Sequence, residues 1–403
     1  MEKKKSVVFS QVKEKLKYVD WKLIVPYLVL LGTGLLMVYS SSSYFAMTQF
    51  NNSEYFLIRQ LIFTVTSILV IFIVSMVNVR IWKSRTFLIY TGFLIFLMLI
   101  FLLVRGVAIN GASAWINLGF FSIQPSELLK VILILYLGVY LSENQEKFAN
   151  IQIVNEKSIF KKIYYVAKKP LLIIGLFILL VGLQPDMGGV IIISGICLVM
   201  ILVSGLPLRY SLGAIGIITG IYLVFILFVK WQGTLPFLPA YMVERFTAFL
   251  DPFGDTKASS FQLVNSFYAL ARGGLFGVGI GHSVQKTGYL PESYTDFIIP
   301  IMAEELGLIR VIIILMLFFY IIYRIFKISL KVKDSFGQLV TIGIGTMFLI
   351  QGTINVGGAI GILPLTGVTF PFVSYGGSSL LVSTVALAIV NNIYINDQMR
   401  KRK

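Results

Sequence analysis

The sequence predicts an all-α polytopic membrane protein with about ten transmembrane helices and a large outer loop between the seventh and eighth. Two properties indicate this class. Of the 403 residues, 57% are hydrophobic and only 13% are charged, whereas soluble domains carry about 25% charged residues. Apolar windows of about nineteen residues also recur along the chain, and inside a bilayer such windows must satisfy their own backbone hydrogen bonds as helices.

The predicted spans follow one another along most of the chain. The first follows Lys22 and reaches about Ser40, which is long enough to cross a bilayer. The fifth and sixth are short and are separated by Gln184, Pro185 and Asp186. The spans are expected to begin near Leu23, Phe56, Phe87, Leu128, Leu171, Gly188, Leu212, Phe297, Leu339 and Leu380.

These spans divide the chain into one membrane domain and two tails. A basic tail covers residues 1–22, the membrane domain covers 23–395, and a second basic tail covers 396–403. Within the membrane domain, residues 230–296 form a large extracytoplasmic loop. Loops of that length are usually functional or disordered. The interspersed aromatic, glycine and charged residues of this loop favour amphipathic structure at the membrane surface.

Basic residues are distributed unevenly between the two sides of the predicted bundle. Most of the 34 Lys and Arg residues fall in the two tails and in the connections on the same side. Cytoplasmic loops carry such an excess, so both termini are predicted to be cytoplasmic. The net charge of +16 has the same explanation. No soluble basic domain is predicted, so nucleic acid is not an expected partner.

The rare residue types exclude several kinds of site. Cys197 is the only cysteine, which excludes a disulfide or a zinc cluster within one chain. A Ser-His-Asp triad or a histidine-ligated metal would need His282, the only histidine, which is expected to be an ordinary loop residue. The glycine-rich run 273–281 lacks the Gly-Lys-Ser/Thr ending of a phosphate loop, so nucleotide binding is not predicted.

Asp296 is the strongest candidate for chemistry. It ends the outer loop and is followed directly by the apolar run that begins at Phe297. A charged side chain at that depth is costly unless it is paired, hydrated or used, so it is a functional candidate. Glu304 lies about 12 Å further along a helix axis, too far for direct partnership. It is expected to bond a neighbouring helix or Arg310.

Further polar groups lie toward the outer side. Trp115 is either an aromatic anchor at the membrane surface or part of a site. Glu127 and Lys130 are three residues apart, so they share a helix face, where opposite charges lower each other's burial cost. This pair is either structural or functional. Asp186 interrupts two apolar spans and either faces a polar cavity or forms a surface turn.

Six short segments follow one another along the chain: the Trp115 loop, Gln124-Pro125-Ser126-Glu127 with Lys130, Gln184-Pro185-Asp186, Leu290-Pro291-Glu292 with Thr295-Asp296-Phe297, Glu304-Glu305-Leu306-Gly307, and Ser374-Tyr375-Gly376-Gly377-Ser378. In this order, they closely resemble the SEDS family of bacterial envelope proteins, which is named for shape, elongation, division and sporulation. The resemblance runs from about Asp20 to Tyr394, and the run 279–286 is more similar to the division members than to the elongation members. Tyr294 and Ala114 depart from the family, which commonly has His and often Arg at these positions.

The resemblance implies a peptidoglycan glycosyltransferase that polymerises lipid II at the outer face of the bacterial cytoplasmic membrane. The implied partners are a class B penicillin-binding protein and other divisome proteins. Asp296 is similar to the family's essential aspartate, and Trp115 matches a functionally important position. The positions expected to bind substrate are Trp115, Glu127, Lys130, Asp186, Lys286, Glu292 and Ser374.

The implied reaction suits these residues. A sugar hydroxyl attacks the anomeric carbon of a donor whose leaving group is a lipid pyrophosphate, and Asp296 could take the hydroxyl proton as general base. Cations could steady the pyrophosphate, as could a divalent ion, although the sequence shows no dedicated metal cluster. An apolar groove between helices would hold the polyprenyl chain. The candidate cations are Lys286, Lys130, Arg245 and Arg272.

Two other functions remain open. A transporter that flips a lipid-linked sugar would also use interrupted spans and intramembrane charges. It should need charges along a full path, whereas the polar motifs gather toward the outer side. A scaffold that recruits division proteins would not need buried charges, and its function should survive the loss of Asp296.

Overall fold

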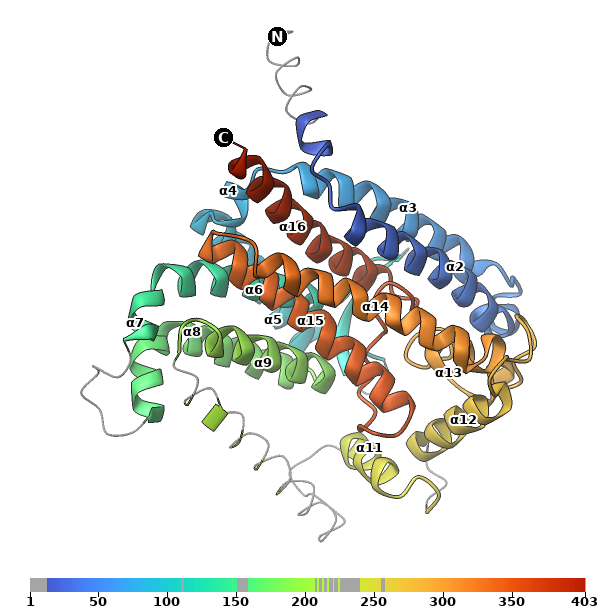
Figure 1. The fold of residues 1–403 in the computed structure, drawn as a ribbon. Helices are drawn as coiled ribbons and strands as arrows, with labels where there is room; N and C mark the ends of the chain where they lie inside the picture. The colour runs from blue at the N-terminus through green and yellow to red at the C-terminus, as the bar shows by residue number, and fades with distance from the viewer. Residues whose placement is uncertain are drawn as a thin grey trace.

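The computed structural model describes residues 13–109, 112–119, 121–150, 159–206, 240–254 and 258–402, together with residues 209, 212, 213, 216, 220 and 224. Over these residues the chain is a bundle of long helices with one small antiparallel sheet (Figure 1). Seven of the described helices are long and apolar enough to cross a membrane. The predicted class, an all-α polytopic membrane protein, is therefore confirmed.

The long helices match the predicted spans closely. The fifth and sixth spans correspond to α8 (Ile159–Gly182) and the shorter α9 (Met187–Leu202). The seventh, expected from Leu212, lies largely outside the described residues, so the count of about ten stays a prediction. The seven qualifying helices are α2 (Trp21–Phe50), α3 (Tyr55–Met76), α5 (Arg85–Arg105), α6 (Pro125–Glu143), α14 (Leu308–Ser329), α15 (Ser335–Ala359) and α16 (Gly377–Lys401).

Short elements connect and cover the long helices. In the sheet, β2 pairs with β1 and with β3, so that Val107 lies opposite Trp115 and Ile116 opposite Ile123. Two of the short helices, α11 and α12, lie within the segment predicted as the large outer loop. The elements are α4 (Val79–Trp82), β1 (Val107–Ile109), β2 (Ala112–Asn117), β3 (Ser122–Ile123), α7 (Gln145–Ala149), α11 (Ala240–Leu250), α12 (Ala258–Gly273), the π-helical turn Gln285–Tyr289 and α13 (Ile298–Leu306).

The eighth predicted span is broken where the sequence analysis expected one helix. It begins as α13, stops at Gly307 with φ +83°, and continues as α14. A Cβ at Gly307 would lie 2.4 Å from the backbone of Gly277, so only glycine permits this approach. The glycine-rich run 273–281 therefore packs backbone against backbone on the end of α13, where Val278 and Gly279 donate to the carbonyls of Glu304 and Glu305.

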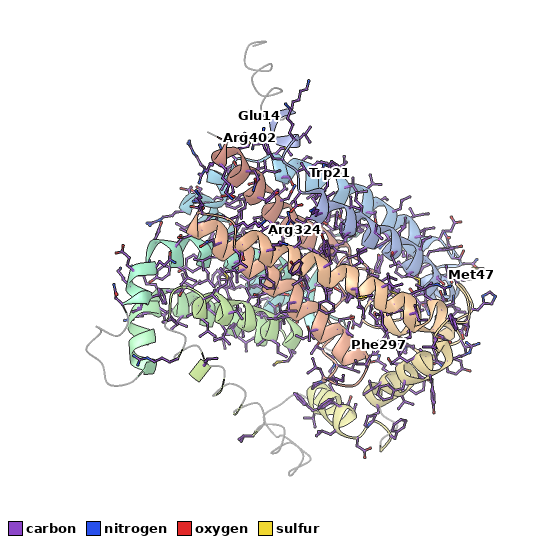
Figure 2. All side chains as sticks on the ribbon, viewed as in Figure 1. Glu14, Trp21, Met47, Phe297, Arg324 and Arg402 are labelled. Carbon is purple, nitrogen blue, oxygen red and sulfur yellow. The ribbon has the colours of Figure 1, made fainter. Side chains whose placement is uncertain are left out.

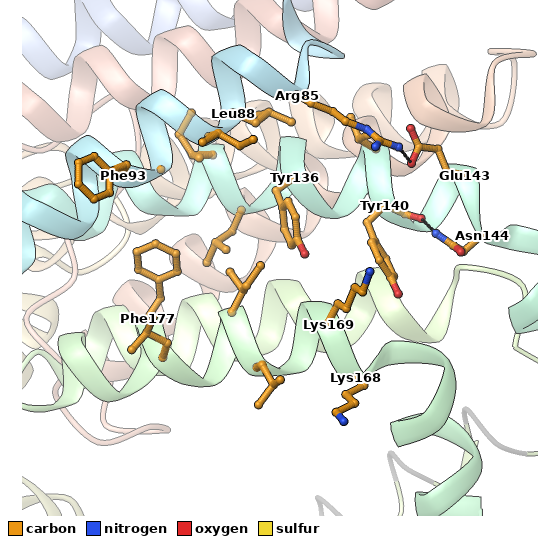
Figure 3. A pocket seen from close by; sticks show the side chains of 18 of the residues that line it. Arg85, Leu88, Phe93, Tyr136, Tyr140, Glu143, Asn144, Lys168, Lys169 and Phe177 are labelled. Atoms are coloured by element: carbon orange, nitrogen blue, oxygen red, sulfur yellow. Dashed lines mark hydrogen bonds and ion pairs between the residues drawn. The ribbon is translucent and has the colours of Figure 1, made fainter.

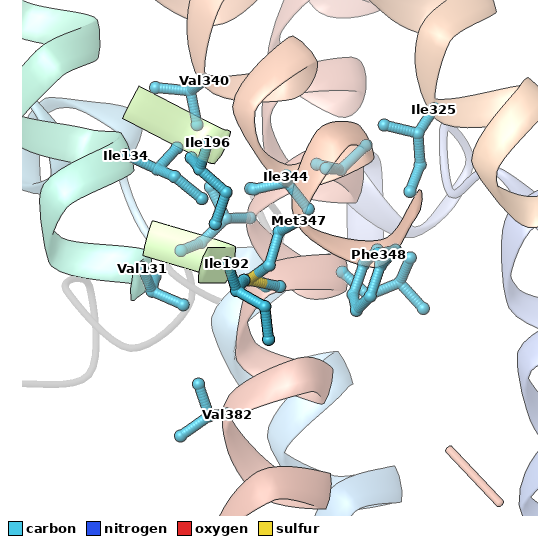
Figure 4. Packing of buried hydrophobic residues seen from close by; sticks show 14 of the residues in the cluster. Val131, Ile134, Ile192, Ile196, Ile325, Val340, Ile344, Met347, Phe348 and Val382 are labelled. Atoms are coloured by element: carbon cyan, nitrogen blue, oxygen red, sulfur yellow. The ribbon is translucent and has the colours of Figure 1, made fainter. Parts of the chain in front are cut away.

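The apolar core lies where α6, α9, α15 and α16 meet, and Figure 4 shows Ile134, Ile196, Ile344 and Met347 packed there. Glycine lets these helices approach closely, since a Cβ at Gly343 would lie 2.8 Å from Ile134. Small residues at such contacts are typical of membrane bundles, in which packing replaces the hydrophobic effect between helices.

Both ends of the described chain lie at one end of the bundle. Figure 2 shows Glu14 and Arg402 together there, whereas Met47 and Phe297 lie toward the other end. Hydrogen bonds join three helices toward this end. Arg324 Nε donates to Asp20 Oδ2 at 2.7 Å, and the Asp20 backbone N–H donates to Asn391 Oδ1 at 3.1 Å. We call this set (Asp20, Arg324 and Asn391) the terminal staple.

Candidate active site at the α13 entrance

The residues before α13 form a tight loop that is fixed by its own backbone. The N–H groups of Thr295 and Phe297 donate to the carbonyl of Glu292, at 3.1 and 3.2 Å. Glu292 has φ +57°, an uncommon conformation for a side-chain-bearing residue. Its carboxylate accepts the Thr295 hydroxyl at 2.6 Å. This loop sets the position of Asp296 one residue before the N-cap of α13.

A second loop, residues 364–376, is joined to the first. Ser374 Oγ donates to the carbonyl of Thr295 at 2.6 Å, and Tyr375 N donates to the carbonyl of Tyr294 at 2.8 Å. From α15, Asn355 Nδ2 donates to the carbonyl of Asp296 at 2.9 Å and to that of Val368 at 2.7 Å. The Asp296 backbone is therefore held from two directions.

Asn355 is a positioning residue that the sequence analysis missed. It lies on the predicted ninth span and is buried, and its side-chain amide links the two loops that border Asp296. An amide in an apolar span is itself a signal, because polar groups at membrane depth must find a partner. The sequence shows that amide but not that its partner is a carbonyl 59 positions away.

Tyr294, which departs from the family pattern, fills an aromatic cluster behind the loop. Its ring centroid lies 4.6 Å from that of Phe56 and 5.7 Å from those of Phe45 and Tyr375. These rings come from α2, α3 and the loop before α16, so the first loop is packed against three separate parts of the chain. The tyrosine serves here as a packing residue.

The Asp296 carboxyl lies between a cation and another acid. A Cβ placed on Gly367 would lie 3.5 Å from Asp296 Oδ2 and 3.6 Å from Nη2 of Arg245, so the two side chains share this corner. Asp296 is half-buried. Loss of water raises its pKa to about 7, the nearby Glu292 carboxylate adds to the rise, and the Arg245 guanidinium opposes it. Such a carboxyl can exchange a proton near neutral pH.

Asp186 links the start of α9 to the start of α6, close to the loop that contains Gly367. Its carboxylate caps α9 by accepting Gly189 N–H, and it also accepts Gln124 Nε2 at 3.0 Å and Ser126 Oγ at 2.8 Å from the start of α6. A Cβ on Gly188 would lie 3.2 Å from the carbonyl of Thr366. Residues 366–368 therefore touch the Asp186 turn on one side and Asp296 on the other.

The predicted Glu127–Lys130 pair is confirmed as a contact. Lys130 Nζ lies 2.8 Å from Glu127 Oε1, and the Lys130 side chain is 1% exposed. The pair lies on the first turns of α6, beside Ser126. Trp115 is half-buried on β2, and β2 packs against both α5 and α6. Glu127 and Lys130 thus lie on the helix whose first residues contact Asp186, and Trp115 lies on a strand that packs against that helix.

Lys286 lies in a different environment from Asp296. Its ammonium donates to Glu305 Oε1 at 2.6 Å and to Ser40 Oγ at 3.0 Å, and Ser40 also donates to Glu305. The adjacent Glu304 accepts Arg272 at 2.7 Å, which confirms the expected bond to a neighbouring helix. Arg310, the other expected partner of Glu304, donates instead to the carbonyls of Phe276 and Leu306.

The fold and the site together define a class: a polytopic membrane protein with a half-buried carboxyl group of raised pKa at the entrance of a membrane helix. A family model described as "Cell cycle protein", covering FtsW, RodA and SpoVE, matches residues 21–399. The chain belongs to this family, as the resemblance to the SEDS proteins predicted.

Curated relatives match over nearly the whole chain. A probable peptidoglycan glycosyltransferase FtsW from Lactococcus lactis is 36% identical, covering 96% of this chain and 95% of its own. Stage V sporulation protein E from Bacillus subtilis is 38% identical, covering 93% and 96%.

Solved structures share the fold. A chain from a peptidoglycan synthase complex, studied for how polymerization and crosslinking are coordinated, is 25% identical with a TM-score of 0.72, covering 94% of this chain and 98% of its own. The rod shape determining protein RodA from Thermus thermophilus is 23% identical with a TM-score of 0.64, covering 94% and 97%.

Proposed function

We propose that this protein is a peptidoglycan glycosyltransferase that polymerises lipid II, with Asp296 as its general base. The activity rests on family membership and on relatives that carry this name over almost their full length. The observation that carries the role of Asp296 is its place at a helix entrance held by two hydrogen-bonded loops, next to the side chain of Arg245. Burial and the nearby Glu292 carboxylate raise its pKa there.

In the proposed step, the acceptor sugar's 4-hydroxyl oxygen forms a bond to the donor's anomeric carbon. The bond from that carbon to the pyrophosphate oxygen breaks, and the lipid pyrophosphate leaves as an anion. Asp296 takes the hydroxyl proton. A base works best when its pKa lies near the operating pH, and a pKa of about 7 meets that condition.

Arg245 is the favoured cation for the pyrophosphate among the four candidates. What supports it is its position beside Asp296 Oδ2, around Gly367. We assign Lys286 to the folding of the loop that leads to Asp296, and Glu127 with Lys130 to the wall beside the Asp186 turn.

A divalent cation fits the site only together with substrate. No group of three or more His, Cys, Asp or Glu side chains that could hold a metal occurs among the described residues. Asp296 and Glu292 nevertheless lie close enough for each charge to affect the other. Magnesium commonly binds one or two carboxylates plus substrate phosphates, so Glu292 would hold it together with the substrate, and it would neutralise pyrophosphate charge while Asp296 keeps the role of base.

We place the Asp296 end of the bundle on the outer face of the bacterial cytoplasmic membrane and both termini in the cytoplasm. The excess of Lys and Arg at the terminal end supports this orientation. A class B penicillin-binding protein is the proposed partner, because a chain with the same fold comes from a peptidoglycan synthase complex. Septal synthesis with other divisome proteins is the proposed role, from the FtsW relatives.

Lipid flipping is less favoured by the arrangement of charges. Buried charges lie near Asp296 and Asp186 and in the terminal staple, which joins α2, α14 and α16 at the opposite end. The buried polar side chains of α3 and α16 between these ends, such as Ser67 and Thr384, are uncharged, whereas a flippase would need charges along a full path. A scaffold would not need Asp296 at all, so the same experiment separates the three functions.

The test is polymerisation of purified lipid II by the reconstituted protein, with and without a co-expressed class B partner. We expect glycan product from the native protein and from Asp251→Asn, which alters an exposed carboxylate just after α11. Asp296→Asn should yield no product above background. Undiminished polymerisation by folded Asp296→Asn would exclude Asp296 as the base. Lipid II crossing the bilayer without polymer would favour the transporter.

A further inference from the structure

A large cavity opens between α5, α6 and α8, away from Asp296. Its volume is about 1520 Å³, above the roughly 300–1,000 Å³ of pockets for drug-sized ligands. Figure 3 shows Phe93 and Phe177 facing each other at one end, and Arg85, Glu143 and Lys169 at the other. The cavity is thus apolar at one end and charged at the other.

The cavity lies in the terminal half of the bundle. On α6 the lining residues run from Ile132 to Glu143, the last residue of the helix. The helix contacts Asp186 through Ser126, at its start. Seventeen residues separate Ser126 from Glu143, or about 25 Å of helix. The charged rim is therefore distant from the proposed glycosyltransferase site, so a headgroup bound at the rim would not be the reacting pyrophosphate.

The depth of the cavity matches one leaflet of a membrane. On α5 the lining runs from Arg85 to Phe96, and on α6 from Glu143 back to Ile132. Each stretch covers eleven residue steps, or about 16 Å. Half of a bilayer's hydrocarbon core is about 15 Å thick. An acyl chain entering from the rim would therefore reach the end of the apolar lining near the bilayer centre.

The rim of the cavity carries more cations than acids. Arg85, Lys147, Lys168 and Lys169 line it, and Glu143 is the one acid among the lining residues that the structure describes. Arg85 pairs with Glu143 at 2.7 Å, and both side chains are largely exposed. Lys168 Nζ lies 6.0 Å from the centre of the Tyr164 ring, and no carboxylate of the described residues lies within ion-pair distance of it. The excess of cations complements an anionic headgroup.

We propose that this cavity binds an acidic phospholipid of the terminal-side leaflet, with its acyl chains between Phe93 and Phe177 and its phosphate at Lys169, which points into the cavity (Figure 3), while Lys168 adds positive charge at the rim. The lipid fills the space between α5, α6 and α8 and joins these helices. This proposal does not depend on the glycosyltransferase activity, because its measurement is lipid binding.

The test titrates the full-length protein in detergent with phosphatidylglycerol or phosphatidylcholine and counts bound lipids by native mass spectrometry. We expect the first phosphatidylglycerol to bind at least tenfold more tightly than phosphatidylcholine. The double substitution Lys168→Gln and Lys169→Gln should lower phosphatidylglycerol affinity by roughly tenfold, since each surface lysine contributes to attraction of anionic lipid. The matched control, Lys327→Gln with Lys331→Gln, removes two exposed lysines elsewhere at the same end and should change nothing.

A second variant tests the apolar part. Gly92 lines the cavity, and a Cβ there meets nothing within 4 Å. Gly92→Leu should therefore fill acyl-chain space and weaken both lipids equally. Gly32→Leu is its control, because Gly32 on α2 is equally open but lies outside the cavity. Equal binding of the two lipids, retention of phosphatidylglycerol by both test variants, or a tightly held polyprenyl phosphate in place of phospholipid would each overturn the proposal.

Discussion

Three carboxylates lie within ten residues at the start of the broken eighth span, and they occupy opposite environments. Glu304 and Glu305 are 0% and 1% exposed, and each has a cation and a hydroxyl as partners. Asp296 is less buried, yet it lies beside both Glu292 and Arg245, and burial and Glu292 raise its pKa. Glu304 and Glu305 therefore hold neighbouring segments together, whereas the neighbours of Asp296 include a second acid, which adds to the rise of its pKa.

Replacing each acid in turn tests whether Asp296 and the two glutamates have different roles. Asp296→Asn should lower the rate of lipid II polymerisation by about 10²–10⁴-fold, the usual effect of losing a general base. It should not lower the unfolding temperature. Glu305→Gln should instead lower the unfolding temperature. Activity loss in Asp296→Asn that is matched by an equal loss of folded protein would remove the distinction.

The Lys286–Glu305 pair offers the next largest effect. Glu305→Leu alone should cost about 3–5 kcal/mol of unfolding free energy, because Lys286 is left buried without its partner. Adding Lys286→Met should recover most of that loss, since well-packed apolar residues replace buried pairs at little cost. The buried thiol of Cys197 can report unfolding through its rate of labelling.

The double variant also decides the role of Lys286. If the Lys286→Met, Glu305→Leu protein is stable and polymerises lipid II, Lys286 has a structural role, as we propose. If it is stable but inactive, Lys286 binds substrate, as the sequence predicted. Failure of Lys286→Met to restore stability would mean that the ion pair is not what Glu305 contributes.

The pH profile should show a tenfold effect per unit. Because burial raises the pKa of Asp296 to about 7, kcat/KM should rise tenfold per pH unit below that value and level off above it. Arg245→Gln removes the charge that lowers this pKa, so its rise should move to higher pH. Arg310→Gln, an exposed arginine that bonds backbone carbonyls, is the control. A profile that is flat across neutral pH would contradict this assignment.

Stability should respond to pH in the opposite direction. The pKa of Asp296 is higher in the folded state than its value of about 3.9 in unfolded chains, so the folded state binds more protons between these values. The contribution of Asp296 to stability therefore falls as pH rises from about 4 to about 7. Asp296→Asn should unfold at a higher temperature than the native protein near pH 8 and at the same temperature near pH 4. An unchanged difference between the two pH values would argue against a raised pKa.

Gly367→Ala should have the smallest effect. Gly367 has φ +75°, and its new methyl group would lie 3.5 Å from Asp296 Oδ2. The left-handed backbone costs a non-glycine residue about 1–2 kcal/mol. Gly119→Ala, with φ +85° and open space around its Cβ, carries the same strain away from Asp296. Polymerisation should slow only in Gly367→Ala, and equal activities would show that this corner is not used.

The polar residues of the site are easier to predict from the sequence than the partners they contact. The Glu127–Lys130 contact was predictable because helix geometry fixes neighbours three residues apart. Asp186 was expected either to face a cavity or to form a turn, and it caps α9 while also accepting side chains from α6. Lys286 was expected with the substrate cations, yet its position in the fold is beside Glu305. Spacing along the chain carries no information on which helices meet.

By itself, the sequence determined the membrane class, the order of spans and the family, because hydropathy and charge act locally and motifs keep their order along the chain. Only the tertiary structure brought Arg245, Gly367 and Asn355 to Asp296 and separated Asp296 from the paired Glu304 and Glu305. The broken helix at Gly307 was also decided there. The reason is physical: the burial and charge environment that set the pKa of a carboxyl come from residues that are distant in sequence and adjacent only in the fold.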